Sequence, residues 1–198
     1  MPQYFRFYIG HNLHFRGQLD SLQCRAQTRA GHRCGRTTVI GLGLCWSHLL
    51  STRQLRIQPS TVAGAGKGLF AMNHRVPANR VIFHENAVIC EYGGEVIDND
   101  DLEERYDDHT GPYVVRINRN RYEDGALERG IGTIACHQDE PNENARLAIY
   151  SPGPGLNNKI RLVATKAIRN GREIFVNYGD EYEMDEPGVH YSTTARRI

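Results

Sequence analysis

Two stretches in the second half of the chain decide the fold: residues 136–147 read CHQDEPNENARL, and residues 167–179 read AIRNGREIFVNYG. In the second stretch an apolar run rich in β-branched and aromatic side chains lies between Gly171 and Gly179, which predicts a short strand bounded by turns. In the first stretch Pro141 and neighbouring asparagines form a loop that leads into another apolar run. Both stretches therefore favour short strands joined by loops.

The same pattern extends over the chain from Arg56 onward. Short β-type runs alternate with Gly, Pro, Asn and Asp, and the predicted strands are Val81–Phe83, Val88–Tyr92, Tyr113–Asn118, Arg146–Tyr150, Ile160–Ala164 and Ile174–Asn177. One helix is predicted from Asp98 to Tyr106, because Asp98 can cap its N-terminus and acids fill its first turn. Pro-Gly-Pro-Gly at 152–155 predicts a hairpin or loop. The body is expected to be a mainly-β domain.

Length and composition fit a globular protein with one ordinary domain and a small appendage. The chain has 198 residues, of which 39% are hydrophobic and 24% charged. It has no run of 18 apolar residues, so no membrane span and no membrane partner are expected, and its first ten residues are too polar for a signal peptide. We expect an intracellular protein.

Charge is divided unevenly along the chain. Residues 1–56 hold eight Arg and one acid, a net charge of +7, and the remainder carries −6. A basic head on an acidic body suggests that the head meets a polyanion and the body a basic substrate. The alternative is the ordinary charge variation of small domains, and the sequence alone leaves both open.

Three of the five cysteines lie in the basic head, in the pattern Cys24-x9-Cys34-x10-Cys45-x2-His48. An odd cysteine count without a secretion signal argues against a disulfide framework. Four thiol and imidazole ligands suit tetrahedral zinc, and four protein ligands make such a site structural. The head also resembles a small zinc-binding module of the form CxAxTxxGxxC…CxxH. The alternative is a set of free thiols on a tail without metal.

In the body, a glycine-rich stretch, GAGKGLF at 64–70, is a weak signal alone, because it lacks the GK[ST] of a phosphate loop. It is followed in order by VICEYGGEVI at 88–97, Tyr113 after Gly-Pro, GIG at 130–132, and the two stretches quoted above. Taken together, these blocks resemble the SET-domain family of protein-lysine methyltransferases. The resemblance covers about residues 56 to 182.

The resemblance implies a β-clip-like SET fold: several small curved sheets around a threaded, knot-like crossing of the two quoted stretches. It also implies S-adenosylmethionine as the methyl donor and a lysine channel that meets the donor end to end. The expected domains are a basic Cys/His zinc-binding head at 1–50, the SET methyltransferase domain at 57–182 and a tail at 183–198. Residues 51–56 are expected to form a short linker.

The family's site residues carry over to matching positions. Tyr178 matches the catalytic tyrosine, and Tyr92 matches a channel tyrosine that takes part in catalysis. The expected cofactor-binding residues are Gly66, Lys67, Gly68, Leu69, Tyr113, Cys136, His137 and Tyr178. The expected channel residues are Tyr92, Val176 and Tyr182. For His137 a structural role at the crossing and a role in cofactor binding are equally open.

The sequence departs from the family pattern at three places. Cys136 stands where the family has an Asn that binds the cofactor, and a thiol is a weaker hydrogen-bonding group. The tail has no cysteine cluster, so Tyr182, Val189 or Tyr191 would close the channel unless the tail is disordered. Val176 replaces a bulky aromatic residue of many relatives, which predicts room for more than one methyl group.

Two classes of function follow. The first is S-adenosylmethionine-dependent methylation of protein lysine, with histone tails as the expected substrate and the nucleus favoured over the cytoplasm; a non-histone protein substrate stays open. The second is a catalytically weak or inactive SET-like binding module, whose zinc head recruits a protein partner or nucleic acid. Cys136 is the residue that favours the second class.

Overall fold

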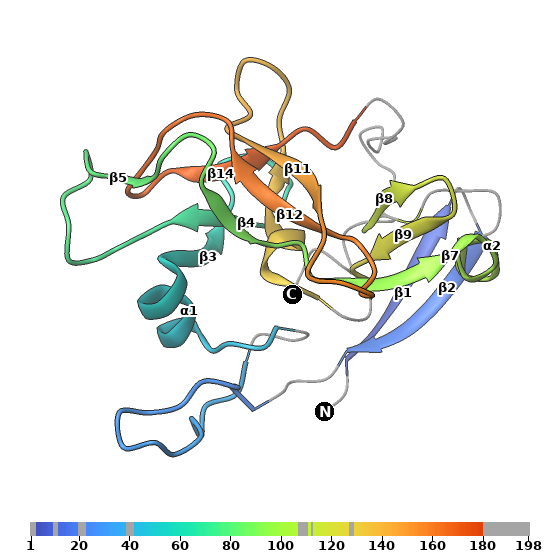
Figure 1. Ribbon diagram of the computed structural model, residues 1–198, viewed down its shortest axis with the longest axis horizontal. Helices are drawn as coiled ribbons and strands as arrows, with labels where there is room; N and C mark the ends of the chain where they lie inside the picture. The colour runs from blue at the N-terminus through green and yellow to red at the C-terminus, as the bar shows by residue number, and fades with distance from the viewer. Residues whose placement is uncertain are drawn as a thin grey trace.

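The computed structural model describes residues 3–9 and 12–19 as backbone, and residues 23–38, 42–106, 111, 113–126 and 129–179 with side chains. Short strands dominate these residues (Figure 1). The elements are β1 (Gln3–Ile9), β2 (Asn12–Leu19), α1 (Trp46–Arg53), β3 (Leu55–Pro59), β4 (Lys67–Ala71), β5 (Val81–Phe83), β6 (Val88–Glu91), β7 (Glu95–Asp98), α2 (Asn99–Tyr106), β8 (Val114–Asn118), β9 (Arg121–Asp124), η1 (Ile131–Ile134), β10 (Cys136–His137), β11 (Ala145–Tyr150), β12 (Lys159–Ala164), β13 (Ile168–Arg169) and β14 (Glu173–Val176).

The strands form several small sheets, as the mainly-β prediction required. The largest has the order β3-β4-β14-β11-β12-β6, with β10 added beside β14. A second sheet has the order β7-β9-β8, a third pairs β13 with β5, and β1 and β2 form an antiparallel hairpin. Figure 1 shows the β7-β9-β8 sheet and α2 at one end of the molecule, and α1 with the head at the other. Among the described residues, no helix has the length and apolar character needed to cross a membrane.

The predicted elements are confirmed with boundaries within one residue. All six predicted strands are present as β5, β6, β8, β11, β12 and β14, and the predicted helix is α2. Asp98 caps α2, because its Oδ1 accepts a hydrogen bond of 3.1 Å from the Asp101 N–H. Residues 152–155 form the loop between β11 and β12, as predicted.

The predicted linker at 51–56 is wrong. Residues 51–53 are the last turn of α1, and Leu55 and Arg56 begin β3, which pairs along its whole length with β4. Leu55 and Ile57 alternate inward as buried residues, and this burial against the core determines the conformation of the segment.

The two stretches expected to cross are held together around β14. Strands β10 and β11 both pair with β14 in parallel, through Cys136 opposite Phe175 and Ala145 opposite Val176. Between those strands the Asn144 side chain donates a hydrogen bond of 2.8 Å to the carbonyl of Glu173 and accepts one of 3.0 Å from the N–H of Phe175. One carboxamide therefore satisfies two backbone groups on one edge of β14.

One continuous core joins the head to the body. It contains residues from α1 and its approach, Leu42 and Leu49, together with Leu55, Ile57 and Leu69 of β3 and β4. Because burial of such side chains contributes most of the stability of a small domain, the head is anchored by apolar contact as well as by the chain.

We predict that Asn144→Ala lowers the free energy of unfolding by about 1–3 kcal/mol, since the carbonyl of Glu173 and the N–H of Phe175 both lose their side-chain partner. Urea unfolding followed by circular dichroism measures the change. Asn142→Ala is the matched control, because Asn142 is exposed in the same loop, and it is expected to stay within about 0.5 kcal/mol of the natural chain. Equal effects of the two changes would contradict the role given to Asn144.

Candidate functional site

The four predicted metal ligands come together in the head. The ligand atoms of Cys24, Cys34, Cys45 and His48 all lie within 4.8 Å of one another. Cys45 Sγ is 3.3 Å from His48 Nδ1, Cys24 Sγ is 3.5 Å from the same nitrogen, and the Cys34 and Cys45 sulfurs are 4.0 Å apart. Zinc–sulfur bonds of about 2.3 Å in a tetrahedron give ligand–ligand distances of roughly 3.8 Å. The cluster therefore has the donor set and size of a structural zinc site.

Local backbone contacts explain why these side chains converge. Isolated bridges pair Gln23 with Thr37 and Gln27 with Arg33, so Cys24 and Cys34 lie opposite each other across a narrow loop. Gly31 turns the loop with a φ of +78°, a backbone conformation that favours glycine. Cys45 and His48 lie three residues apart at the start of α1, which places both side chains on one face.

The protonation of one ligand, Cys24, also suits a metal. Burial raises the pKa of the Cys24 thiol, but the N–H groups of Cys45 and Ala26 and the His48 side chain outweigh burial and lower that pKa to about 6. A thiolate is the form that binds zinc. For Cys34, the backbone hydrogen bond with Arg36 lowers the pKa, but burial and the neighbouring Cys45 and Cys24 thiols outweigh it and raise that pKa. Burial also raises the pKa of Cys90, which lies in β6 outside the cluster, to about 12.

The glycine-rich stretch lies against the last strand of the crossing. The buried Glu173 carboxylate accepts hydrogen bonds from Ser60 Oγ at 2.6 Å and from the N–H of Thr61 at 2.7 Å. A Cβ added at Gly68 would lie 1.9 Å from Glu173 Oε1, so only glycine fits there. Gly66 turns the loop with a φ of +73°. Glu173 therefore shapes the glycine-rich loop, although 105 positions separate Gly68 and Glu173 in the sequence.

Several expected cofactor residues meet at this loop. The Cys136 thiol donates a hydrogen bond of 3.4 Å to the carbonyl of Lys67, the first residue of β4. His137 Nδ1 accepts one of 3.1 Å from the N–H of Tyr178, and its Nε2 lies 3.2 Å from Asp139 Oδ1. Because Nδ1 is an acceptor, the proton of a neutral His137 is on Nε2. These contacts give His137 a structural role at the crossing; its role in cofactor binding stays a prediction.

Tyr178 is half-buried beside His137. Its ring centroid is 5.2 Å from that of His137, and its hydroxyl donates a hydrogen bond of 2.7 Å to the carbonyl of Ala135. The phenol oxygen and the carbonyl oxygen thus lie next to each other beside β10. Two oxygens with partial negative charge can stabilise a neighbouring cation or steer a neighbouring amine.

Tyr92 and Tyr113 form a second pair. The Tyr92 hydroxyl donates a hydrogen bond of 2.8 Å to the carbonyl of Tyr113, whose ring faces the guanidinium of Arg129 at 4.2 Å. Behind Tyr92 the backbones of Gly93 and Gly130 touch: a Cβ at Gly130 would lie 2.1 Å from the Tyr92 carbonyl oxygen. The chain leading to η1 therefore passes directly against the turn after Tyr92.

A buried acid, Glu123, holds that turn. Glu123 Oε1 accepts hydrogen bonds from the N–H groups of Gly93 and Gly94, at 3.0 and 2.9 Å, and Oε2 accepts one of 2.5 Å from Ile160. Burial raises the pKa of Glu123, and the three N–H donors oppose this effect. Glu123 thus fixes the backbone that follows Tyr92 to both β9 and β12.

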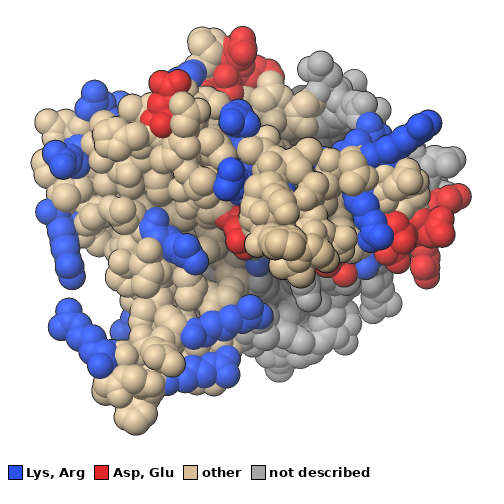
Figure 2. Space-filling model, viewed as in Figure 1, with Lys and Arg blue, Asp and Glu red and all other residues tan. Residues whose placement is uncertain are grey.

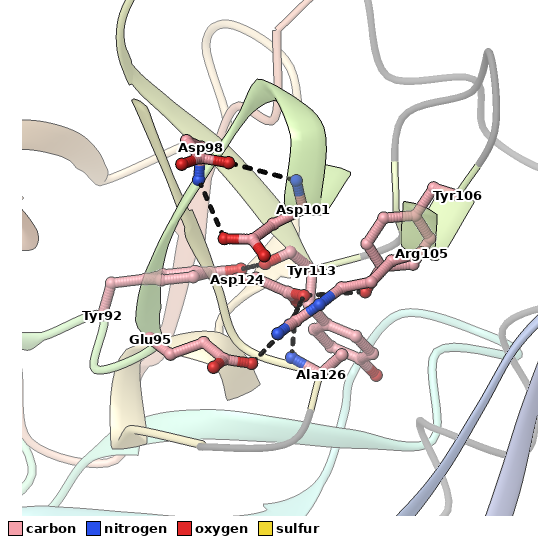
Figure 3. Close-up of polar contacts among 9 residues, drawn as sticks. All are labelled: Tyr92, Glu95, Asp98, Asp101, Arg105, Tyr106, Tyr113, Asp124 and Ala126. Atoms are coloured by element: carbon pink, nitrogen blue, oxygen red, sulfur yellow. Dashed lines mark hydrogen bonds and ion pairs between the residues drawn. The ribbon is translucent and has the colours of Figure 1, made fainter. Parts of the chain in front are cut away.

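Asp124 anchors α2 to the same sheet (Figure 3). Its carboxylate accepts hydrogen bonds from Arg105 at 2.8 Å, from the Tyr106 hydroxyl at 3.0 Å and from the N–H of Ala126 at 2.8 Å. Arg105 also pairs with Glu95, and these two acids raise its pKa. Burial raises the pKa of Tyr106, so its hydroxyl stays protonated and remains a donor.

The two groups of predicted residues share one core. Leu69, Tyr92 and Val176 belong to the same buried cluster, against which Tyr178 packs. Tyr182, Val189 and Tyr191, the candidates to close the channel, lie outside the described residues. Sequence reasoning missed Glu123 and Asp124; two adjacent acids in the short run RYED were the available signal, since acids are depleted in strands and rarely fully buried without partners.

Comparison with known proteins agrees with this geometry. The family model described as "SET domain" matches residues 66–179, from the glycine-rich loop to the residue after Tyr178. The chain belongs to the SET domain family. This assignment puts it among SET-type methyltransferases, and the Cys/His cluster lies before the SET match. A search among curated proteins gave no match.

Solved structures of a fungal complex share the SET fold. The chain is similar to ctPRC2, the Chaetomium thermophilum Polycomb Repressive Complex 2, in an autoinhibited conformation bound to S-adenosylmethionine, with 25% identity and a TM-score of 0.51 over 66% of this chain and 16% of that chain. Apo ctPRC2 matches with 26% identity and a TM-score of 0.51 over 65% and 16%. A humanized mutant of the complex with a bound inhibitor matches with 24% identity and a TM-score of 0.51, over 66% of this chain and 16% of that chain. At this identity the likeness shows the fold alone. The present chain thus spans about one sixth of those chains.

We predict that each chain binds one zinc ion, and that Cys45→Ser or prolonged chelation removes it. Loss of the ion is expected to lower Tm by several degrees, because Leu42 and Leu49 join the head to the core. Native mass spectrometry counts the ion and differential scanning calorimetry measures Tm. Cys90→Ala is the control and keeps the zinc, since Cys90 lies outside the cluster. Metal-free natural protein, or full zinc in Cys45→Ser, would contradict the site.

Proposed function

We propose that the protein is a protein-lysine N-methyltransferase that uses S-adenosylmethionine. The observation that carries the proposal is the convergence of the glycine-rich loop, Cys136-His137 and Tyr178 around β14 within a SET domain. These segments are far apart in the sequence and meet through main-chain pairing and two side-chain contacts. We assign this place to the methyl donor. We assign Tyr92 to the lysine channel, and Tyr113 to the point where the channel meets the donor.

The residues present fit S-adenosylmethionine by charge. The donor carries a carboxylate and a sulfonium cation. Lys67 supplies an exposed cation at the loop, and the oxygens of Tyr178 and Ala135 supply partial negative charge beside β10. A similar structure binds this donor, which supports the same choice here. We assign donor contacts to Gly66, Lys67, Gly68 and Leu69 of the loop, and to Tyr113, Cys136, His137 and Tyr178.

When bound, the donor supplies an electrophilic methyl group. The chain's own residues must bring an uncharged amine to it in line. A channel walled by Tyr92 and the buried Val176 removes water from the substrate lysine, and burial lowers the pKa of an amine. The hydroxyl of Tyr178, itself oriented by the Ala135 carbonyl, directs the amine lone pair. Alignment of two reacting groups supplies much of the rate enhancement in such a transfer.

Tyr92 can hold the channel open because its position is fixed at both ends. Its hydroxyl is bound to the Tyr113 carbonyl, and the turn that follows it is bound to Glu123. The acid network of Arg105, Asp124 and Tyr106 braces the sheet that carries Glu123 (Figure 3). A rigid wall of this kind is what preorganised catalysis requires.

The charge of the body supports a basic protein substrate. Residues 57–198 carry a net charge of −6, and α2 has acids in its first turn. Lysine-rich histone tails have the complementary charge, and we propose them as substrate, with the nucleus as the place of action. A basic segment of a non-histone protein has the same chemistry and is separated from histones by the substrate assay below.

A second candidate function is a SET-like binding module without turnover. Cys136 favours it, because its thiol is engaged with the Lys67 carbonyl and is a weaker hydrogen-bonding group than the amide expected at that position. Under this alternative the head recruits a partner and the body binds a peptide without modifying it. Incorporation of labelled methyl into any protein by the natural chain excludes it.

We predict that the natural chain transfers labelled methyl to core histones, and that Tyr178→Phe lowers kcat by at least about a hundredfold while Tm changes little. The reason is that the hydroxyl that orients the amine is lost and the ring is kept. Tyr150→Phe is the matched control, because the Tyr150 hydroxyl makes a similar bond of 2.8 Å to Glu91 on the surface. Labelled methyl in proteins of whole lysate but not in histones would show that the substrate is a non-histone protein. Full activity of Tyr178→Phe would overturn the role of Tyr178.

We also predict that the product carries more than one methyl group, because Val176, two residues before Tyr178, is small enough to leave room beside the amine. Mass spectrometry of an accepted peptide at saturating donor measures the degree. Val176→Phe or Val176→Tyr is expected to shift the product toward monomethyl-lysine. A natural chain that yields only monomethyl-lysine on every accepted peptide would contradict this prediction.

A further inference from the structure

A long part of the chain contains no acid at all. Residues 21–84 hold nine Lys and Arg and no Asp or Glu, whereas residues 85–198 hold 13 Lys and Arg and 22 Asp and Glu. All nine cations lie in the described part of the chain and all nine are exposed; they are Arg25, Arg29, Arg33, Arg36, Arg53, Arg56, Lys67, Arg75 and Arg80. The proposed methyl transfer does not require this separation of charge, since a basic substrate would be attracted by the acidic residues 85–198 alone.

The cations gather on one side of the molecule. Figure 2 shows Lys and Arg over the lower left, where Figure 1 places the head and α1, and a group of Asp and Glu on the side of α2. Among the described residues, none of the nine cations forms an ion pair with a carboxylate. An exposed surface rich in cations attracts a polyanion.

An open groove of about 540 Å³ lies within this surface, between α1 and strands β3 and β4. Its charged and titratable lining residues, Arg56, Lys67 and His74, are all exposed. Its apolar lining includes Trp46, the only tryptophan of the chain, which is 46% exposed at the first position of α1. The groove thus combines a cationic rim with an exposed, flat aromatic side chain.

We propose that this groove binds single-stranded nucleic acid, with a base stacked on Trp46 and the phosphates along Arg56 and Lys67. Base stacking on an aromatic side chain beside a cationic track is the general way in which proteins hold single strands without sequence preference. A duplex keeps its bases stacked inside and offers no free base face to Trp46. An acidic peptide would satisfy the cations and leave the indole without a planar partner.

The proposal goes beyond methyl transfer, and its test does not measure methyl transfer. Trp46 and Arg56 lie outside the residues assigned to the donor and the lysine channel. Lys67 connects the two places, because it lines the groove and its carbonyl accepts the Cys136 thiol. A strand held in the groove would therefore lie next to the glycine-rich loop and could bring nucleic-acid-bound proteins to the enzyme.

The test uses the intrinsic fluorescence of the zinc-loaded full chain, since Trp46 is the only tryptophan and reports its own stacking. Mixed-sequence 12-nucleotide single strands of RNA and of DNA are titrated, with the matching duplex and poly-glutamate as competitors of the same charge. We expect at least one single strand to quench the fluorescence and to bind at least about fivefold more tightly than either competitor. Affinity should fall as salt rises.

Variants separate stacking from bulk charge. Trp46→Ala should weaken single-strand binding by about tenfold, measured by anisotropy of labelled strand, and Trp46→Phe should retain part of the affinity. Arg56→Gln should reduce the salt slope by about 0.7. Arg119→Gln, an exposed arginine between β8 and β9, is the control and should change affinity less than twofold.

Zinc content and circular dichroism check that each variant is folded. Absence of quenching, unchanged affinity of a folded Trp46→Ala chain, or equal binding of duplex or poly-glutamate would overturn the proposal. None of these results depends on methyl transfer, so the groove and the proposed enzyme function fail or succeed separately.

Discussion

The structure depends on the pairing of one strand, β14, which accepts β10 and β11 in parallel and β4 in antiparallel register. Asn144 supports this pairing with a single side chain that binds two backbone groups of β14, the carbonyl of Glu173 and the N–H of Phe175. His137 adds a second contact at the far end through the N–H of Tyr178. Since the glycine-rich loop, Cys136 and Tyr178 all lie on strands paired to β14 or next to them, the proposed donor site exists only when this crossing is formed.

The site is braced by groups that never touch a reactant. Glu173 shapes the glycine-rich loop, Glu123 fixes the turn after Tyr92, and Asp124 ties that sheet to α2. Each is a buried carboxylate whose hydrogen-bond donors come from a different part of the chain. Burying acids is costly unless they are hydrogen-bonded, so these networks make the local arrangement specific. The head with its Cys/His cluster is joined to the core of the body through Leu42 and Leu49.

The sequence predicted what is local and missed what is set by distant contacts. The zinc ligands followed from spacing, since Cys45 and His48 share one helical turn, and the strands rich in β-branched residues were found within one residue. Helix α1 was missed because its N-cap Cys45 offers no side-chain hydrogen bond and only Leu49 of the helix is buried. Strand β9 was missed because Glu123 and Asp124 disfavour a strand until Gly93, Ile160 and Arg105 satisfy them. The β1–β2 hairpin was missed because its alternating runs, Phe5-Arg6-Phe7 and Leu13-His14-Phe15, are short.

The proposed enzyme function requires that a SET domain whose expected asparagine is Cys136 still binds S-adenosylmethionine. Isothermal titration calorimetry of the zinc-loaded chain with this donor tests that claim most directly, with a thermal-shift measurement on the same sample. We expect saturable binding of one donor molecule per chain and a rise in Tm that grows with donor concentration. No heat of binding and no thermal shift at millimolar donor would contradict it and leave a SET-like binding module.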